Sequence, residues 1–180
     1  ADQLKIMLES NWGNQVMTEE VARAIAEIAH QHGKKVSAHI SLSRDIVTAV
    51  NVGVDDLAHM ALDKVSNELL KKIVDADIYW TPTLEVWKGF ASQGIVPDTY
   101  LLDNLGRFAK AGGKVALGTD YGAGPFHFEL GMPMKEIQWM HEAGMSPSDI
   151  IISATKNAAE VCGLGGELGT LERGKIADIL

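Results

Sequence analysis

Two short apolar runs in this sequence each end in a histidine. They are Val36-Ser37-Ala38-His39 and Asp56-Leu57-Ala58-His59. Imidazole nitrogens bind zinc and similar divalent ions, and α/β barrels carry their active-site groups at the carboxyl ends of parallel strands. If both runs are strands of one parallel sheet, the two histidines lie at the same edge of it. The pattern therefore predicts that His39 and His59 share a metal site.

Two further polar residues lie at or near the ends of apolar runs. Lys5 belongs to the run 1–8, and Asp120 ends the run 114–120. A carboxylate oxygen complements imidazoles in a divalent-metal site, and a catalytic site of this kind leaves one position open for water. Because a bound metal makes that water acidic, the site supplies hydroxide near neutral pH. Lys5, His39, His59 and Asp120 together indicate hydrolytic chemistry at one mouth of the fold.

Each of the four residues also has a plainer interpretation. His39 and His59 could be core histidines that are held by hydrogen bonds. Asp120 could cap a helix or form a turn beside Gly122, and Lys5 could form an ion pair inside the barrel. The paired placement of the histidines, followed by an acid at a third strand end, favours the metal site.

Four other features have weaker claims to function. The segment 30–32, with histidines two residues apart, is interpreted as a helix end, because such residues point to different sides of a helix. His127 follows the run 114–120 and is a candidate substrate-binding residue or a surface histidine. Trp87 and Phe90 could line a pocket or pack an inserted loop. Cys162 is predicted to be a buried thiol.

Hydrophobic periodicity places these residues in alternating strands and helices. The predicted strands are 1–8, 35–40, 54–59, 77–81 and 114–120; the predicted helices are 18–33, 43–53, 66–75, 100–111 and 134–143, with a loose insert at 84–98. This alternation predicts parallel strands joined by right-handed crossovers. Polar residues at several strand ends favour a barrel over an open nucleotide-binding sheet, which would place its signal in one glycine-rich turn.

The predicted fold is therefore α/β, a partial (β/α)8 TIM-type barrel. A complete barrel has eight strands and about 250 residues, whereas this chain has 180 residues. We expect residues 1–165 to form strands 4 to 8 of the barrel and residues 166–180 to start a C-terminal β-segment. The uncovered edges of a half barrel predict self-association or a partner fragment that supplies the N-terminal half.

Composition excludes several classes of protein. The net charge is −8, and the lysines and arginines are scattered, which argues against a nucleic-acid partner. With 46% hydrophobic and 22% charged residues the chain reads as globular. It has no run of the roughly 20 apolar residues that a membrane helix needs and no signal-peptide pattern at its start. The prediction is a soluble, cytoplasmic protein without a membrane partner.

The chain resembles the second half of enzymes of the amidohydrolase superfamily, in the imidazolonepropionase-like and Xaa-Pro dipeptidase-like branch. The resemblance rests on the run 1–7, the two histidine-ended runs, Gly118-Thr119-Asp120 and the tail 166–180, which is its most specific part. It covers nearly all of this chain but only about half of the barrel of the superfamily. The first-strand His-x-His pair of the superfamily would lie upstream of Ala1.

The resemblance implies a role for each of the four residues. Lys5 would be carboxylated by carbon dioxide and bridge two metals, and His39 and His59 would bind one of them. Asp120 would bind the other metal and move protons. A lysine among apolar neighbours tends to lose its proton, and the neutral amine can then form a carbamate.

The implied function of the intact protein is metal-dependent hydrolysis of amide, peptide or cyclic amide bonds. The cofactors would be two divalent ions, with zinc expected, and the substrate would be a small-molecule amide or a dipeptide. With part of the ligand set missing, the chain alone is expected to have weak or no turnover. The alternatives are a non-catalytic barrel fragment or binding module without metal, and a metal-free barrel enzyme that binds phosphate.

Overall fold

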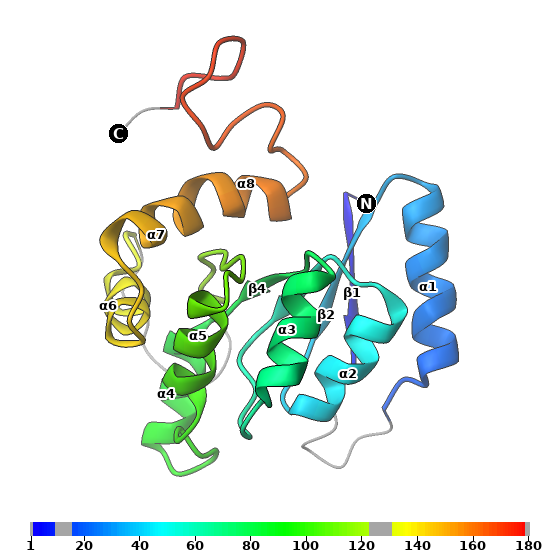
Figure 1. The fold of residues 1–180 in the computed structure, drawn as a ribbon, viewed down its shortest axis with the longest axis vertical. Helices are drawn as coiled ribbons and strands as arrows, with labels where there is room; N and C mark the ends of the chain where they lie inside the picture. Colours follow the sequence, from blue (N-terminus) through cyan, green and yellow to red (C-terminus); the bar gives the residue numbers. More distant parts are fainter. Residues whose placement is uncertain (1, 10–15, 123–130, 179–180) are drawn as a thin grey trace.

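The structure is a computed structural model that describes residues 2–9, 16–122 and 131–178. Its centre is a parallel sheet of four strands in the order β1-β2-β3-β4 (Figure 1). The strands are β1 (Gln3–Met7), β2 (Lys35–His39), β3 (Asp56–Ala58) and β4 (Tyr79–Thr81). Strand order follows chain order, as expected when each strand is joined to the next by a right-handed crossover.

The register of the sheet decides which side chains share a face. Met7 pairs with His39, which in turn pairs with Ala58, and Lys5 pairs with Ser37. Because side chains alternate between faces along a strand, Lys5 and His39 lie on the same face of the sheet. The opposite face is apolar and carries fully buried residues of the core, including Val36, Ala38, Leu57 and Trp80.

Helices cover the apolar face of the sheet. They are α1 (Glu19–Gln31), α2 (Ser43–Val52), α3 (Asn67–Asp75) and α5 (Leu101–Lys110), and they pack in succession against one another. Local chemistry fixes their ends: Thr18 and Ser66 cap α1 and α3 with their hydroxyls, and Gly53 ends α2 with a φ of 76°. These four helices and the strands before them agree with the predicted elements to within a few residues.

The insert predicted at 84–98 is wrong in part, because a helix begins it. Helix α4 (Leu84–Ser92) follows β4 directly and packs against α6 (Met134–Glu142). The N-terminal N–H groups of α4 are bound by the side chain of Glu136, 51 and 52 residues further along the chain. A cap that arrives from so far away leaves no local signal in the sequence.

The predicted strand 114–120 is shortened to one parallel bridge between Trp80 and Val115. On the side away from β4, its backbone groups are bound by a helical segment. The N–H of Leu117 donates to the carbonyl oxygen of Ser153 at 3.0 Å, and Nδ2 of Asn157 donates to the carbonyl oxygen of Val115 at 2.8 Å. Both partners belong to a π-helical turn (Ser153–Asn157) between α7 (Pro147–Ile152) and α8 (Ala158–Val161).

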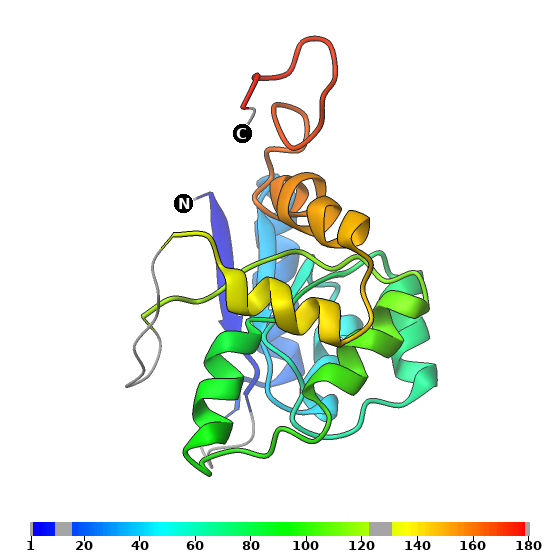
Figure 2. The same ribbon diagram turned by 90° about the vertical axis from the view of Figure 1, so that its left-hand side faces the viewer.

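Beyond α8 the chain extends away from the rest of the molecule (Figures 1 and 2). Residues 166–178 form turns and bends, and the expectation that 166–180 starts a β-segment stays a prediction. Cys162 is exposed, so the prediction of a buried thiol is wrong, because the helix ends at Val161 just before it. Within the described ranges, no helix is both long and apolar enough to cross a membrane.

Candidate functional site

The two predicted histidines meet at the carboxyl ends of the strands. His39 is the last residue of β2, His59 follows β3, and their ring centroids are 4.3 Å apart with an angle of 67° between the planes. The Nε2 atoms of both rings are buried and have no hydrogen-bond partner among the described residues. Nε2 of His39 lies 3.2 Å from Oε2 of Glu9, close enough for an ion pair but without hydrogen-bond geometry.

Strand β4 and the residues after it hold His59 in place. The N–H of His59 donates to the carbonyl oxygen of Thr81 at 2.9 Å, and its own carbonyl oxygen accepts the indole N–H of Trp80 at 2.5 Å. Nδ1 of the ring lies 2.7 Å from the hydroxyl oxygen of Thr83. Both the backbone and the ring of His59 are therefore fixed, with Nε2 left unbound.

Left-handed backbone conformations occur at His59 and at two other non-glycine residues of this site. His59, Thr83 and Asp120 have φ values of 78°, 47° and 52°, a region that non-glycine residues seldom adopt. Each such residue costs on the order of 1–3 kcal/mol and persists only where surrounding contacts impose it. The three residues line one cavity, so backbone strain is gathered at the candidate site.

Burial lowers the pKa of both imidazoles. The pKa of His59 falls to about 2, through burial and then the positive charges of His39 and Lys5. The pKa of His39 falls to about 4, through burial and Lys5, although Asp120 and Asp45 act in the opposite direction. Both rings are therefore neutral near pH 7, the protonation state in which histidine binds metals.

Lys5, His59 and Asp120 line a cavity of about 340 Å³ on the inner face of the sheet. The other lining residues are Gln3, Leu4, Ser37, Asp56, Ala58, Thr81, Thr83, Gly118, Thr119 and Val161. Lys5 and Asp120 are exposed. This exposure differs from the apolar surroundings that the sequence predicted for Lys5, and its carboxylation stays a prediction.

Asp56 belongs to the same cavity and was not among the predicted site residues. It is buried in β3, and its carboxylate accepts hydrogen bonds from the hydroxyls of Ser37 at 2.7 Å and Thr81 at 2.6 Å. Burial raises its pKa, while the two hydroxyl donors lower it. An acid on the inward-facing side of a predicted strand is the signal that would have identified it. Glu9 and Thr83, which contact the two histidines, gave no comparable signal.

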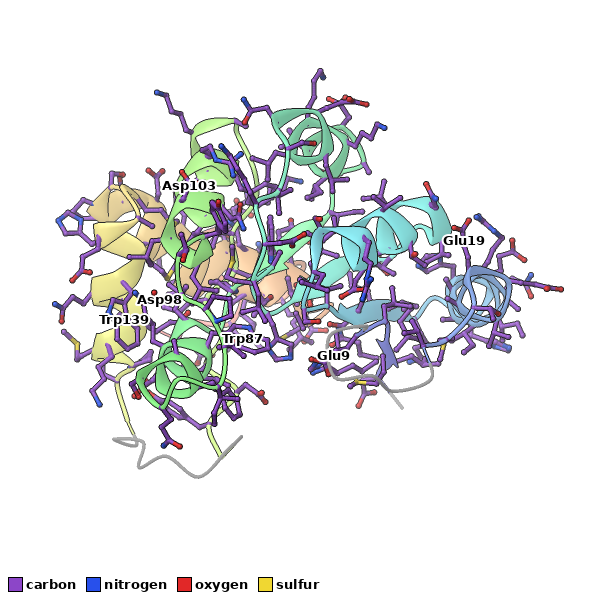
Figure 3. The ribbon with its side chains drawn as sticks, turned by 90° about the horizontal axis from the view of Figure 1, so that it is seen from below. Glu9, Glu19, Trp87, Asp98, Asp103 and Trp139 are labelled. Atoms are coloured by element: carbon purple, nitrogen blue, oxygen red, sulfur yellow. The ribbon has the colours of Figure 1, made fainter. Side chains whose placement is uncertain are left out.

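Two aromatic side chains of α4 pack in succession beside His59. Trp87 meets its ring edge to face at 5.9 Å, and Phe90 lies 6.0 Å from Trp87. Figure 3 views this end of the molecule and shows Trp87 and Glu9 near the strand ends. These contacts agree with the interpretation that the two aromatics pack the segment after β4 onto the barrel.

The remaining histidines are placed as follows. His30 lies in the last turn of α1 and its Nε2 is 2.9 Å from Oδ2 of Asp55, which confirms the helix-end interpretation of 30–32. His127 lies outside the described residues, so its substrate-binding role stays a prediction. Within 2–9, 16–122 and 131–178, no group of three or more His, Cys, Asp or Glu side chains is placed to hold a metal. The His39–His59 pair, with two unbound Nε2 atoms, fits part of a divalent-metal ligand set.

Comparison with known proteins places the chain in a family. Residues 10–180 match the sequence model described as "Amidohydrolase family". An imidazolonepropionase of Thermoanaerobacter pseudethanolicus is 31% identical over 167 residues, which cover 89% of this chain and 37% of that protein. An ochratoxinase of Aspergillus niger is 29% identical over 174 residues, which cover 89% and 35%. The chain thus spans little more than a third of the length of these curated relatives.

Solved structures share the same architecture. A Xaa-Pro dipeptidase with methionine bound in its active site superposes with a TM-score of 0.84 at 25% identity, over 98% of this chain and 47% of that one. The A. niger ochratoxinase gives a TM-score of 0.82 at 24% identity, over 99% and 43%, and supports the fold alone. These matches confirm the predicted fold class, a partial α/β barrel.

Proposed function

The chain belongs to the amidohydrolase family, and from this premise we propose that the complete protein hydrolyses carbon–nitrogen bonds with a divalent metal. The observation that carries the proposal is the histidine pair. Two neutral imidazoles from adjacent strands face each other, and each keeps a buried Nε2 without a hydrogen-bond partner among the described residues. A buried acceptor with no partner is costly, and a metal ion would satisfy both nitrogens at once.

We assign ligand roles to three side chains that line the cavity and to His39, which lies against His59. His39 and His59 would hold one ion through Nε2, for which zinc is the expected metal. Lys5, as a carbamate, would bind both this ion and a second one, and Asp120 would bind the second ion. When bound, the metal polarises the substrate carbonyl and lowers the pKa of a water molecule.

Asp120 is the proposed proton carrier. Its carboxylate is exposed at the cavity, where it can take a proton from the attacking water and deliver it to the leaving nitrogen. His59 is buried beneath Trp87, so the bound ion would be sheltered from bulk water on that side. Asp120 would therefore both bind a metal and move the proton, whereas the histidines would only bind the metal.

The proposed substrates are small amides, dipeptides and cyclic amides. A cavity of about 340 Å³ lies at the lower end of the range for small-molecule sites. The relatives include an imidazolonepropionase and a Xaa-Pro dipeptidase. The described residues offer two imidazoles, one lysine and one exposed aspartate as ligands, so we propose that the 180-residue chain has weak turnover until a partner fragment or a second copy completes the site.

The test is metal content and hydrolysis by the complete protein that carries this chain. Elemental analysis should find divalent metal, and a panel of Xaa-Pro dipeptides, N-acyl amino acids and cyclic amides should contain a hydrolysed substrate. The His39→Ala/His59→Ala double variant should lose both properties, whereas His30→Ala, which changes an exposed helix-end histidine, should keep them. Native mass measurement should show the added mass of carbon dioxide on Lys5.

Absence of both divalent metal and hydrolysis in the complete protein would contradict the proposal. That result would favour the second candidate, a non-catalytic barrel module in which the polar side chains form a core network. The hydrogen bonds of Asp56 with Ser37 and Thr81 are the observation on its side, because they already satisfy one buried acid without any metal.

A further inference from the structure

The hydroxyl of Thr83 does not bind the helix that Thr83 precedes. Thr83 is the N-cap residue of α4, a position where a threonine hydroxyl normally accepts a hydrogen bond from an N–H of the first helical turn. Here the hydroxyl makes no such bond, and its oxygen lies 2.7 Å from Nδ1 of His59 instead. Thr18, Ser66 and Ser146 all cap their own helices in the ordinary way.

Glu136 of α6 caps the start of α4 in place of Thr83. Its Oε1 accepts the N–H of Leu84 at 2.8 Å, and its Oε2 accepts the N–H of Glu85 at 2.8 Å. Glu136 is 0% exposed, so this carboxylate has been buried at the start of α4. Burial disfavours the ionised form of this carboxyl, whereas the two N–H donors and the positive end of the α4 dipole favour it.

The backbone of Thr83 is also constrained. Its φ and ψ are 47° and 48°, which is strained for a β-branched residue, and its side chain is almost fully buried. This conformation, together with the anchored start of α4, aims the hydroxyl at His59. The connection runs from Glu136 through the first turn of α4 to Thr83 and then to the ring of His59.

We propose that Thr83 and Glu136 are positioning residues for His59. Glu136 caps α4 in place of Thr83, and the Thr83 hydroxyl then accepts the Nδ1 proton of His59 and leaves Nε2 of that ring without hydrogen. The reverse tautomer would bury an Nε2–H with no acceptor among the described residues, and an orphaned buried N–H is rarer in proteins than an acceptor that lacks a partner. For the role of Nε2 as a ligand, this inference rests on the proposed function.

The first experiment reads the tautomer in the metal-free complete protein. Long-range ¹H–¹⁵N correlation of histidine-labelled protein, with the His59 signals assigned from a His59→Asn variant, should show a protonated Nδ1 and a bare Nε2. Thr83→Val keeps the branched shape but removes the oxygen, so both tautomers should become populated. Thr83→Ser keeps the hydroxyl and should retain the wild-type pattern. A wild-type ring that carries its proton on Nε2 would overturn the proposal.

The second experiment measures zinc affinity in the same variants. Loss of the partner that orients a metal-binding histidine typically weakens binding by about 10- to 100-fold, and we expect this for Thr83→Val. Glu136→Gln replaces one carboxylate oxygen with an amide that cannot accept an N–H, so it should shift the His59 signals in the same direction by a smaller amount. Unchanged His59 signals in Glu136→Gln would overturn the part assigned to Glu136.

Ser66→Ala is the matched control. It removes an ordinary helix cap, a hydrogen bond of 3.1 Å at the start of α3, away from the cavity. It should lower thermal stability as much as a lost cap does, yet leave the tautomer of His59 and the zinc affinity unchanged. If Ser66→Ala shifted the His59 signals as Thr83→Val does, the effect would be one of general stability and the positioning role would be wrong.

The two readouts separate this proposal from the proposed function. The tautomer is measured without metal, so a response of His59 to Thr83→Val in a protein that binds no zinc would support the positioning role and contradict the metal-dependent function. Zinc binding that is equally tight in wild type and Thr83→Val would leave the function in place and overturn the positioning role. If Thr83→Val fails to fold, the wild-type spectrum, Thr83→Ser and Glu136→Gln still decide the question.

Discussion

The two sides of the cavity are built in different ways. On one side His59 is 3% exposed and covered by Trp87, and its backbone is bound by the carbonyl oxygen of Thr81 and the indole N–H of Trp80 in β4. On the other side Lys5 and Asp120 are exposed, the first on an outer strand of the sheet and the second after the short bridge at Val115. The histidine side is thus organised by the described residues themselves, whereas the Lys5 and Asp120 side gains little packing from them.

Because the two sides differ in packing, a change on each side should have a different effect on chemistry and on stability. A change on the histidine side should disturb both metal binding and folding, because the same contacts serve both. A change on the exposed side should disturb chemistry and leave folding almost unaltered. The following variants test that separation, beginning with the one expected to have the largest effect.

Asp120→Asn should lower turnover of the complete protein by about 100- to 10,000-fold, the usual contribution of a positioned proton carrier. Asparagine tolerates the left-handed backbone of this position, so the free energy of unfolding should change by less than about 0.5 kcal/mol. Steady-state kinetics and urea denaturation measure the two effects. Asp75→Asn, which affects an exposed ion pair with Lys71, is the matched control and should leave turnover intact. Equal turnover in the two variants would contradict the role of Asp120.

His59→Ala should reduce zinc affinity by at least about 100-fold, the upper end of what even an indirect contact to a metal ligand contributes. It should also lower the free energy of unfolding by about 1–3 kcal/mol, because it leaves a buried hole beneath Trp87 and removes the partner of Thr83. Isothermal titration with zinc and urea denaturation measure the pair of effects. Normal zinc affinity with reduced stability would show that His59 is a core histidine only.

The raised pKa of Glu136 predicts that the free energy of unfolding depends on pH. Burial raises its pKa from 4.5 to about 7, and the nearby Glu85 adds to the increase, although the N–H groups of Leu84 and Glu85 lower it. The folded protein therefore holds this proton more tightly than the unfolded chain does. Its contribution to stability is complete below pH 4.5 and is lost as the pH rises through about 7.

The free energy of unfolding of the wild type should therefore fall, relative to that of Glu136→Gln, as the pH rises through this window. Urea denaturation of both proteins at a series of pH values measures the difference. The comparison cancels the contributions of His39 and His59, whose lowered pKa values act in the opposite sense. A constant difference between the two proteins would show that the carboxyl of Glu136 does not titrate in this range.

Lys5→Met should have the smallest effect on folding. Lys5 is exposed, so the free energy of unfolding of the 180-residue chain should change by less than about 0.5 kcal/mol. In the complete protein the same variant should lose the added mass of carbon dioxide. A destabilisation of several kcal/mol in the chain alone would show that the exposed side is as tightly organised as the histidine side, and the contrast between the two would fail.

Much of the fold could be predicted because its signals are local. The caps at Thr18 and Ser66, the left-handed Gly53 and the apolar periodicity of α1 to α3 all act within a few residues. The same patterns placed His39 and His59 at strand ends, and parallel pairing then brought them together.

The missed features depend on distant partners. Helix α4 is stabilised by Glu136, the strand expected at 114–120 has its outer groups bound by Ser153 and Asn157, and the exposure of Lys5 follows from the packing around β1. Thr83 gave no signal because the sequence predicted a loose insert after it and its partner His59 lies 24 residues earlier. Such contacts are decided by the assembled fold and leave no periodic trace in the sequence.

The π-helical turn after α7 has a consequence for how copies of the chain can join. Open-ended growth of a sheet, copy after copy, requires two free edges, one on each side of every copy. On the side of Val115 and Leu117 the carbonyl and N–H that a neighbour would need are already occupied by Asn157 and Ser153. Among the described residues, the outer edge of β1 has no such contact with a helix, so we expect edge-to-edge association to use the β1 side. Association through one edge gives closed pairs, so we expect pairs of half barrels and no open-ended growth.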